Sequence, residues 1–302
     1  MDILFLGTGA SVPSRDRSPP CIALREGSDM VLFDCGEGSQ RQLMISPVSF
    51  MKIRAIFISH MHGDHILGLP GLLQTMGLMG RKDPLLACGP TGFSAAVSSF
   101  LDACEGGIPY ELGLTDMCGG DSVDMGGYRI SAFEVEHGVE ALGFVYEEES
   151  RRGLFDKRRA EELGLRPGPD FTMILNGETV RGVSPAEVIG PSRPGLRVVY
   201  SGDTAPCDTL LEAAEGADVL IHEATYASCD SELAAMHGHS TAAQAAETAR
   251  AAGVKALMLT HISNRYDDPS VLEEEAKQIF GSTRAVRDLD MFTVSAKGVR
   301  SV

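Results

Sequence analysis

Short apolar runs alternate with amphipathic stretches along the whole chain. Apolar runs of about four to eight residues, bounded by polar or glycine residues, are typical of buried strands. They predict strands at Ile3–Leu6, Met30–Asp34, Ala55–Ser59, Tyr128–Val135, Leu142–Tyr146, Arg197–Ser201, Asp218–Ile221 and Ala256–Thr260. Longer stretches at helical spacing predict helices at Ser39–Ile45, Asp64–Met79, Gly92–Ala103, Cys207–Ala214, Thr241–Ala252 and Ser270–Phe280. This mixture indicates a layered α/β or α+β fold.

The segment from about residue 147 to residue 194 breaks this alternation. Charged residues cluster in it, glycine and proline become frequent, and it holds no apolar run long enough for a core strand. We therefore predict an insertion or arm. The alternative is a solvated surface loop, since a run of charges is usually that.

Composition excludes several classes of protein. Hydrophobic residues make up 43% of the 302 and charged residues 23%, as in folded soluble domains. No apolar run reaches the ~18 residues of a membrane span, so no membrane partner is expected. The seven cysteines are scattered without a CxxC pair, which favours free thiols in a reducing cytoplasm. The net charge of −16 argues against a polyanionic partner unless bound cations or a local basic patch outweigh it.

The most informative motif is Ser59-His60-Met61-His62-Gly63-Asp64-His65, which follows a predicted strand. Four potential metal ligands fall within six residues. In extended backbone, His60 and His62 project to the same side, and Gly63 permits a turn that lets Asp64 and His65 face a second point nearby. Nitrogen and carboxylate ligands without thiolates favour zinc, with iron or manganese as alternatives. The simpler reading is a histidine-rich surface turn.

Further ligand types stand directly after other predicted strands, namely His137, Asp203 and His261. Three histidines and an aspartate (His60, His62, His137, Asp203) can hold one metal ion. Asp64, His65 and His261 can hold another, with Asp203 bridging the two. Each residue alone reads as an ordinary polar strand end, but together they complete two coordination spheres.

These motifs resemble the metallo-β-lactamase superfamily and, within it, the ribonuclease Z family of tRNA 3′-processing endonucleases. The resemblance rests on Leu6-Gly7-Thr8-Gly9-Ala10, Asp34-Cys35-Gly36-Glu37-Gly38-Ser39-Gln40, HxHxDH at His60–His65, Tyr200-Ser201-Gly202-Asp203-Thr204, His222-Glu223-Ala224-Thr225, His239-Ser240-Thr241 and Leu259–Tyr266. It implies an αββα sandwich over residues 1–302 with an inserted arm at about 147–194, two Zn²⁺ per chain and a homodimer. The implied activity is removal of the 3′ trailer from precursor tRNA, which leaves a 3′-hydroxyl on the tRNA and a 5′-phosphate on the trailer.

The resemblance also assigns residues to the substrate. The family's arm carries a Gly-Pro motif that clamps tRNA, and Gly168-Pro169 occupies that place, after the basic residues Arg151, Arg152, Lys157, Arg158 and Arg159. A family loop after the first strand reads like Pro-x-Lys-x-Arg-Asn, whereas here it is Pro13-Ser14-Arg15-Asp16-Arg17-Ser18, with Arg15 in place of lysine and Ser18 in place of asparagine. We expect Arg15 and Arg17 to contact the RNA.

For phosphodiester hydrolysis with two metals, we expect Asp64 to be the general base. His239, oriented by Glu223, is the expected proton donor to the leaving ribose oxygen; its alternative role is that of a helix-start residue. Arg265 binds phosphate or packs the site.

Three alternatives remain open. Another hydrolase of the fold, acting on small phosphodiesters or esters, would share HxHxDH but should lack the arm and the His-Glu-Ala-Thr and His-Ser-Thr motifs. An iron–flavin oxygen reductase would carry glutamate in place of His62. A non-enzymatic RNA-binding module would have lost ligands, whereas the sequence retains all seven.

Overall fold

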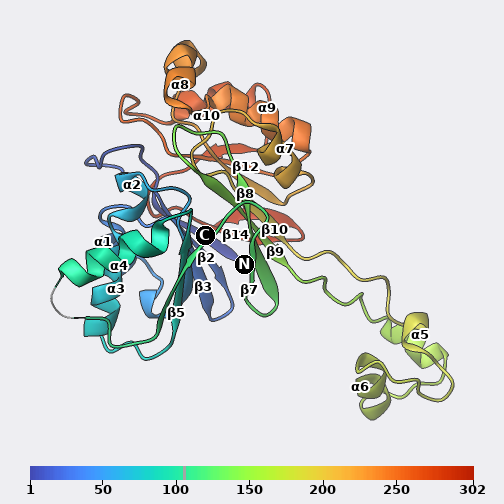
Figure 1. Ribbon diagram of the computed structural model, residues 1–302. Coiled ribbons are helices and arrows are strands. Elements are labelled where there is room, and N and C mark those ends of the chain that lie inside the picture. Colours follow the sequence, from blue (N-terminus) through green and yellow to red (C-terminus); the bar gives the residue numbers. More distant parts are fainter. Residues whose placement is uncertain (105–106) are drawn as a thin grey trace.

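The computed structural model describes residues 1–104 and 107–302. Two β-sheets pack face to face, and helices cover the outer face of each sheet (Figure 1). The predicted αββα sandwich of the metallo-β-lactamase type is thus confirmed.

The first sheet has eight strands in the order β15-β14-β1-β2-β3-β4-β5-β6. From β3 to β6 its strands run parallel, and on the other side of β3 the pairs are antiparallel. Its strands are β1 (Asp2–Gly7), β2 (Cys21–Glu26), β3 (Asp29–Phe33), β4 (Ile53–Phe57), β5 (Leu85–Gly89), β6 (Leu112–Asp116), β14 (Met291–Ser295) and β15 (Gly298–Ser301).

The second sheet has seven strands in the order β13-β12-β11-β10-β9-β8-β7. From β10 to β13 the strands are parallel, so the residues that follow β10, β11 and β12 emerge at one edge. The strands are β7 (Ser122–Asp124), β8 (Tyr128–Glu134), β9 (Leu142–Glu148), β10 (Arg197–Tyr200), β11 (Val219–Glu223), β12 (Leu257–Thr260) and β13 (Thr283–Ala285).

The helices form two outer layers and part of the arm (Figure 1). On the first sheet lie α1 (Ser39–Ile45), α2 (Gly63–Ile66), α3 (Leu69–Leu78) and α4 (Phe93–Ala103). On the second lie α7 (Asp208–Ala214), α9 (Ala242–Ala252) and α10 (Ser270–Lys277), with α8 (Ser231–His237) beside them. The arm carries α5 (Lys157–Glu162) and α6 (Pro169–Leu175).

Successive side chains along a strand point to opposite faces of the sheet, and this alternation builds the core on both faces. In β1, Ile3 and Phe5 join the cluster between the sheets, whereas Leu4 and Leu6 pack under the helices. Burial on both faces explains why such strands read as continuous apolar runs. The aromatic ring of Phe33 stacks on that of Tyr200, with 5.6 Å between centroids, and the Tyr200 hydroxyl donates to Asp34 at 2.6 Å. The core between the sheets therefore extends directly to the edge where β3 and β10 end.

One predicted helix is wrong in extent. The expected helix Asp64–Met79 is two helices, α2 and α3, which break at Leu67-Gly68. Gly68 packs so closely on the segment after β3 that a Cβ there would lie 2.0 Å from the Gly36 carbonyl oxygen. Pro70, which lacks a backbone N–H, fits the first turn of the new helix.

The arm leaves the sandwich after β9 and returns before β10 on two extended segments (Figure 1). It has a small core of its own, formed by Ala160, Leu165, Ile174, Val180, Val183 and Val188. Gly168 has a φ of 100°, which favours glycine, and Pro169 begins α6. No helix in the described ranges is long and apolar enough to cross a membrane.

Candidate active site

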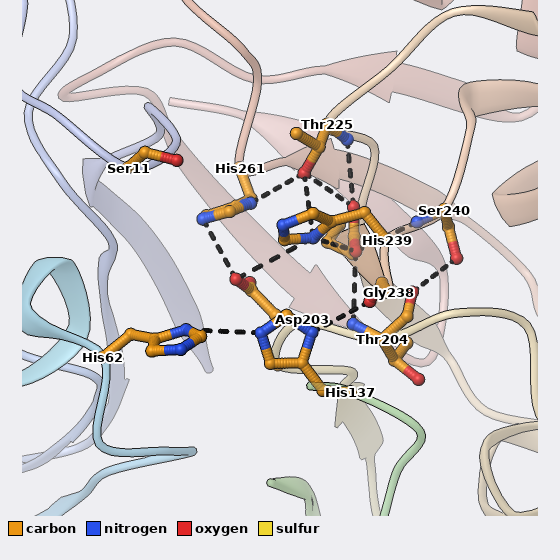
Figure 2. A network of polar contacts seen from close by, with 12 residues as sticks. Ser11, His62, His137, Asp203, Thr204, Thr225, Gly238, His239, Ser240 and His261 are labelled. Carbon is orange, nitrogen blue, oxygen red and sulfur yellow. Dashed lines mark hydrogen bonds and ion pairs between the residues drawn. The ribbon is translucent and has the colours of Figure 1, made fainter. Parts of the chain in front are cut away.

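The ends of strands from both sheets bring the predicted ligands together. His60 follows β4, and a bridge to Ala141 ties it to the chain just before β9. Asp203 and His261 follow the parallel strands β10 and β12. Figure 2 shows His62, His137, Asp203 and His261 turned toward one another. Residues about 200 positions apart in sequence thus meet at one edge of the sandwich.

Three histidines form one cluster. Nδ1 of His62 lies 3.0 Å from Nε2 of His60 and 3.3 Å from Nε2 of His137. These three side chains can together hold a metal ion.

A second cluster lies beside the first. Nε2 of His65 and Nε2 of His261 lie 3.6 and 3.5 Å from Oδ2 of Asp64, and the three side chains can hold a metal ion. Oδ2 of Asp203 lies 3.3 Å from Nε2 of both His65 and His261 and 3.8 Å from Nε2 of His60. Asp203 therefore stands between the clusters, in the place expected of a bridging carboxylate.

The unpaired polar atoms fit a metal. Nε2 of His65 and Oδ1 of Asp203 are buried and have no hydrogen-bond partner among the described residues. Leaving such atoms unpaired costs about 1–3 kcal/mol each, a cost that a bound cation would remove. The nitrogen and oxygen donors are those that zinc, iron or manganese accept.

Three of these histidines have their outward-facing nitrogen occupied by a hydrogen bond. Nδ1–H of His65 donates to Asp34 at 2.8 Å, that of His137 to the Gly238 carbonyl at 2.9 Å, and that of His261 to the Thr225 hydroxyl at 2.8 Å. Such hydrogen bonds fix the tautomer and leave the Nε2 lone pair for a metal. Burial, followed by repulsion from His65, holds the pKa of His60 well below its ordinary value, so its imidazole is neutral and able to bind a metal.

Asp34 is a buried carboxylate that the sequence interpretation did not assign to the site. Besides His65 and Tyr200, it accepts hydrogen bonds from the backbone N–H and the hydroxyl of Ser59, at 2.7 and 2.9 Å. Its φ of 59° is rare for a residue other than glycine. The signal was present, because Asp34 directly follows the apolar strand β3, and Asp203 likewise stands shortly after β10.

Asp64 is held in its ionised form. Burial alone would raise its pKa, but the neighbouring His261 and the charge of His65 bring the pKa below its usual range. Oδ2 of Asp64 also accepts the backbone N–H of Ser11 at 2.8 Å. The carboxylate is thereby fixed from two sides.

His239, which Figure 2 shows beside Asp203, pairs with Glu223. Nδ1–H of His239 donates to Oε1 of the fully buried Glu223 at 2.8 Å. Burial would lower the pKa of His239, but the charge of Glu223 raises it to about 9. The orientation by Glu223 that the sequence predicts is therefore present, with a protonated imidazole facing the site.

The predicted RNA contacts near the site differ in accessibility. Arg15 is exposed. Arg17 is only 7% exposed, and its Nη1 donates to the carbonyl of Tyr266 at 3.0 Å. The guanidinium of Arg265 lies 5.0 Å from the ring centroid of Tyr226 and 3.2 Å from Oδ1 of Asp230. Arg15 is thus the most available of the three.

The basic residues of the arm are all exposed. Arg151 pairs with Glu148 at 2.5 Å, and Arg158 and Arg159 pair with Glu162 at 3.0 and 3.7 Å. Arg152 and Lys157 have no ion-pair partner in residues 1–104 and 107–302.

Two family models match parts of the chain: one described as "Anti-Pycsar protein Apyc1" over residues 1–91 and one as "Beta-lactamase superfamily domain" over residues 179–262. Ribonuclease Z of Methanothermobacter thermautotrophicus is 43% identical over 300 residues, 98% of this chain and 97% of that protein. Ribonuclease Z of Natronomonas pharaonis is 46% identical over 286 residues, 92% of each chain. The crystal structure of the short form of human tRNase Z is similar with a TM-score of 0.73 and 27% identity, and the alignment covers 98% of this chain and all of that one.

The fold and the histidine–aspartate clusters define a hydrolase of the metallo-β-lactamase superfamily. Identity above 40% over nearly the full length goes further: the chain belongs to the ribonuclease Z family. It is a hydrolytic endoribonuclease of tRNA 3′ processing, as the sequence motifs predicted.

Proposed function

We propose that this enzyme removes the 3′ trailer of precursor tRNA with two Zn²⁺ ions per chain. The observation that carries the proposal is the preorganised donor set, in which Nδ1 of His65, His137 and His261 is occupied by a hydrogen bond and Nε2 of each faces the neighbouring donors. His60, His62, His137 and Asp203 would hold one ion, and Asp64, His65, His261 and Asp203 the other. When bound, the two ions would lower the pKa of the attacking water and stabilise the charge of the phosphate.

The chain's own residues would move the protons. Asp64 takes a proton from the attacking water, whose oxygen forms the new bond to phosphorus. The bond from phosphorus to the ribose 3′-oxygen breaks, and His239 gives its proton to that oxygen. The products are a 3′-hydroxyl on the tRNA and a 5′-phosphate on the trailer. General acid–base steps of this kind are typically worth about 10²–10⁴-fold in rate.

His239 suits this role by position and charge. Its pKa of about 9 keeps it protonated at neutral pH, and Nδ1 is committed to Glu223. Nε2 is therefore the nitrogen left to face a leaving group. Thr225 and Ser240 also donate to the Glu223 carboxylate, so the pair is fixed before substrate arrives.

Local basic groups would offset the charge of −16. Near the site we assign RNA contacts to Arg15, Arg17 and Arg265. On the arm we assign them to Arg151, Arg152, Lys157, Arg158, Arg159 and the Gly168-Pro169 turn. Phosphate contacts of this kind position a nucleic acid without reading its sequence.

The arm projects away from the sandwich (Figure 1), which supports two further assignments. The catalytic domain spans residues 1–302, and the segment at about 147–194 is a substrate-binding arm inserted into it. The enzyme acts as a homodimer, in which the arm of one protomer contacts a tRNA held over the site of its partner. We place it in the cytoplasm, where its seven unpaired cysteines would stay reduced.

Metal removal with product mapping tests this function. Chelation should abolish cleavage of a precursor tRNA, and zinc should restore it with two ions per chain by elemental analysis. The tRNA product should end in a 3′-hydroxyl. Hydrolysis of small phosphodiesters without cleavage of precursor tRNA would overturn the proposal in favour of another hydrolase of the same fold.

A further inference from the structure

Asp288 lies between β13 and β14 and joins three separate parts of the chain. Its Oδ1 accepts the backbone N–H and the hydroxyl of Thr8, at 3.0 and 2.7 Å. Its Oδ2 accepts the backbone N–H of Ser18 at 2.7 Å and the side-chain amide of Gln42 at 2.9 Å. Because all four partners are donors, the position suits a group that only accepts, as an ionised carboxylate does.

Two of these partners are the ends of one loop. Thr8 and Ser18 bound the loop that follows β1, and the Gly9 N–H donates to the Ser18 carbonyl at 2.9 Å, which closes the loop at the same point. Gln42 also donates to the Leu6 carbonyl at 2.6 Å. The carboxylate of Asp288 therefore holds both ends of loop 8–18 against the last residues of β1 and against helix α1.

The far end of this loop reaches the site. The N–H of Ser11 donates to Oδ2 of Asp64 at 2.8 Å, and Figure 2 shows Ser11 beside His261. The φ of Ser11 is 63°, a conformation that is strained outside glycine and persists only where surrounding structure imposes it. The exposed Arg15 belongs to the same loop.

We propose that Asp288 is a positioning residue that fixes loop 8–18 beside Asp64, so that Arg15 meets the RNA next to the scissile phosphate. The RNA contact of Arg15 rests on the proposed function, whereas the anchoring of the loop does not. A displacement of about 1 Å in such a contact can cost about 10²-fold in rate. Asp288 lies outside the metal clusters, so its effect on the position of the substrate passes through loop 8–18.

The first test compares Asp288→Ala with Asp218→Ala by hydrogen exchange. Asp218 is a matched control, because its carboxylate accepts the backbone N–H of Arg197 at 2.9 Å and pairs with Lys255 at 2.6 Å. It stands just before β11, at the opposite end of that strand from Glu223. Asp288→Ala should speed exchange of the amides in loop 8–18, with zinc content unchanged, and Asp218→Ala should not. Unchanged exchange in the loop would overturn the anchor.

The second test is a double-mutant cycle of Asp288→Ala and Arg15→Ala on precursor tRNA. Each single change should lower kcat/KM by about 10–10²-fold, and the double variant should be no slower than the slower single one, since residues that act through one contact are not additive. Multiplicative losses, or an equal loss in Asp218→Ala, would overturn the proposal. A wild-type enzyme that leaves precursor tRNA uncut would instead reject the proposed function, and loop exchange would still decide the anchor.

Discussion

The metal-site edge of the sandwich and the arm hold their polar groups in different ways. At the edge, Glu223 is fully buried and accepts five hydrogen bonds, from Thr204, Thr225, His239 and Ser240. On the arm, the Arg158–Glu162 pair is a surface contact with the arginine side chain 90% exposed.

This difference follows from what each region must do. Proton transfer and metal binding require atoms held within a fraction of an ångström, which buried networks provide. An exposed ion pair contributes only about 0–1 kcal/mol, so a phosphate can displace the carboxylate at little cost. On the proposed function, the chemistry would belong to the buried edge, and substrate capture to an exposed extension with a small core of its own.

The largest expected effect is that of Asp64→Ala. Asp64 would bind a metal and accept the water's proton, so the variant should bind less than two zinc ions per chain and lose about 10⁴-fold or more in kcat. Elemental analysis and single-turnover cleavage measure both. A variant that keeps two ions and cuts within tenfold of wild type would show that the base lies elsewhere.

His239→Ala should lose about 10²–10⁴-fold on precursor tRNA but keep both metals. A nitrophenyl phosphodiester has a leaving group that needs little protonation, so the variant should hydrolyse it almost as fast as wild type. The measurement is the rate of His239→Ala relative to wild type on each of the two substrates, with zinc content as a control. Equal slowing on both substrates would mean that His239 is structural.

Asp34→Asn tests the outer support of the site. The asparagine keeps the volume but removes the charge that faces His65, and loss of such a partner typically costs about 10–100-fold in metal affinity. Zinc affinity by chelator competition measures the effect, with Asp218→Asn as the control for a lost carboxylate far from the site. Equal zinc affinity in Asp34→Asn and wild type would show that Asp34 serves only the core.

Glu223→Gln tests the charge state of His239. In the metal-free protein, NMR titration should give His239 a pKa of about 9, and removing the Glu223 charge should bring the pKa toward the 6.5 of an ordinary histidine. The raised pKa also contributes stability that is complete below about pH 6.5 and is lost as pH rises through about 9. An unchanged titration in Glu223→Gln would assign the shift to another group.

The sequence predicted the edge better than the rest of the molecule. The eight predicted strands are present, and all seven predicted ligands converge, because they stand shortly after apolar strands that end at one edge of the sandwich. Asp34 also ends an apolar strand, but the motif that begins with it supported only the family resemblance and gave Asp34 no role at the site.

The structure adds elements that the sequence analysis missed, among them the buried apolar strands β2 and β5. The edge strands β6, β7 and β15 are short and partly exposed, so their alternation is weak. The arm helices α5 and α6 have six and seven residues with mixed charges, too few for a helical period to stand out. The anchoring by Asp288 depends on contacts about 270–280 residues apart in sequence, which no local pattern records.

The most direct test of the division between edge and arm is to remove the arm. Arg151 and Arg193 pair as antiparallel neighbours, so a short glycine–serine turn can replace residues 152–192 without disturbing β9 or β10. The KM for precursor tRNA should rise about tenfold or more, because remote contacts position a large substrate. The kcat/KM for a nitrophenyl phosphodiester and the zinc content should stay within about twofold of wild type. Equal losses on both substrates would contradict the account and make the arm part of the folded catalytic unit.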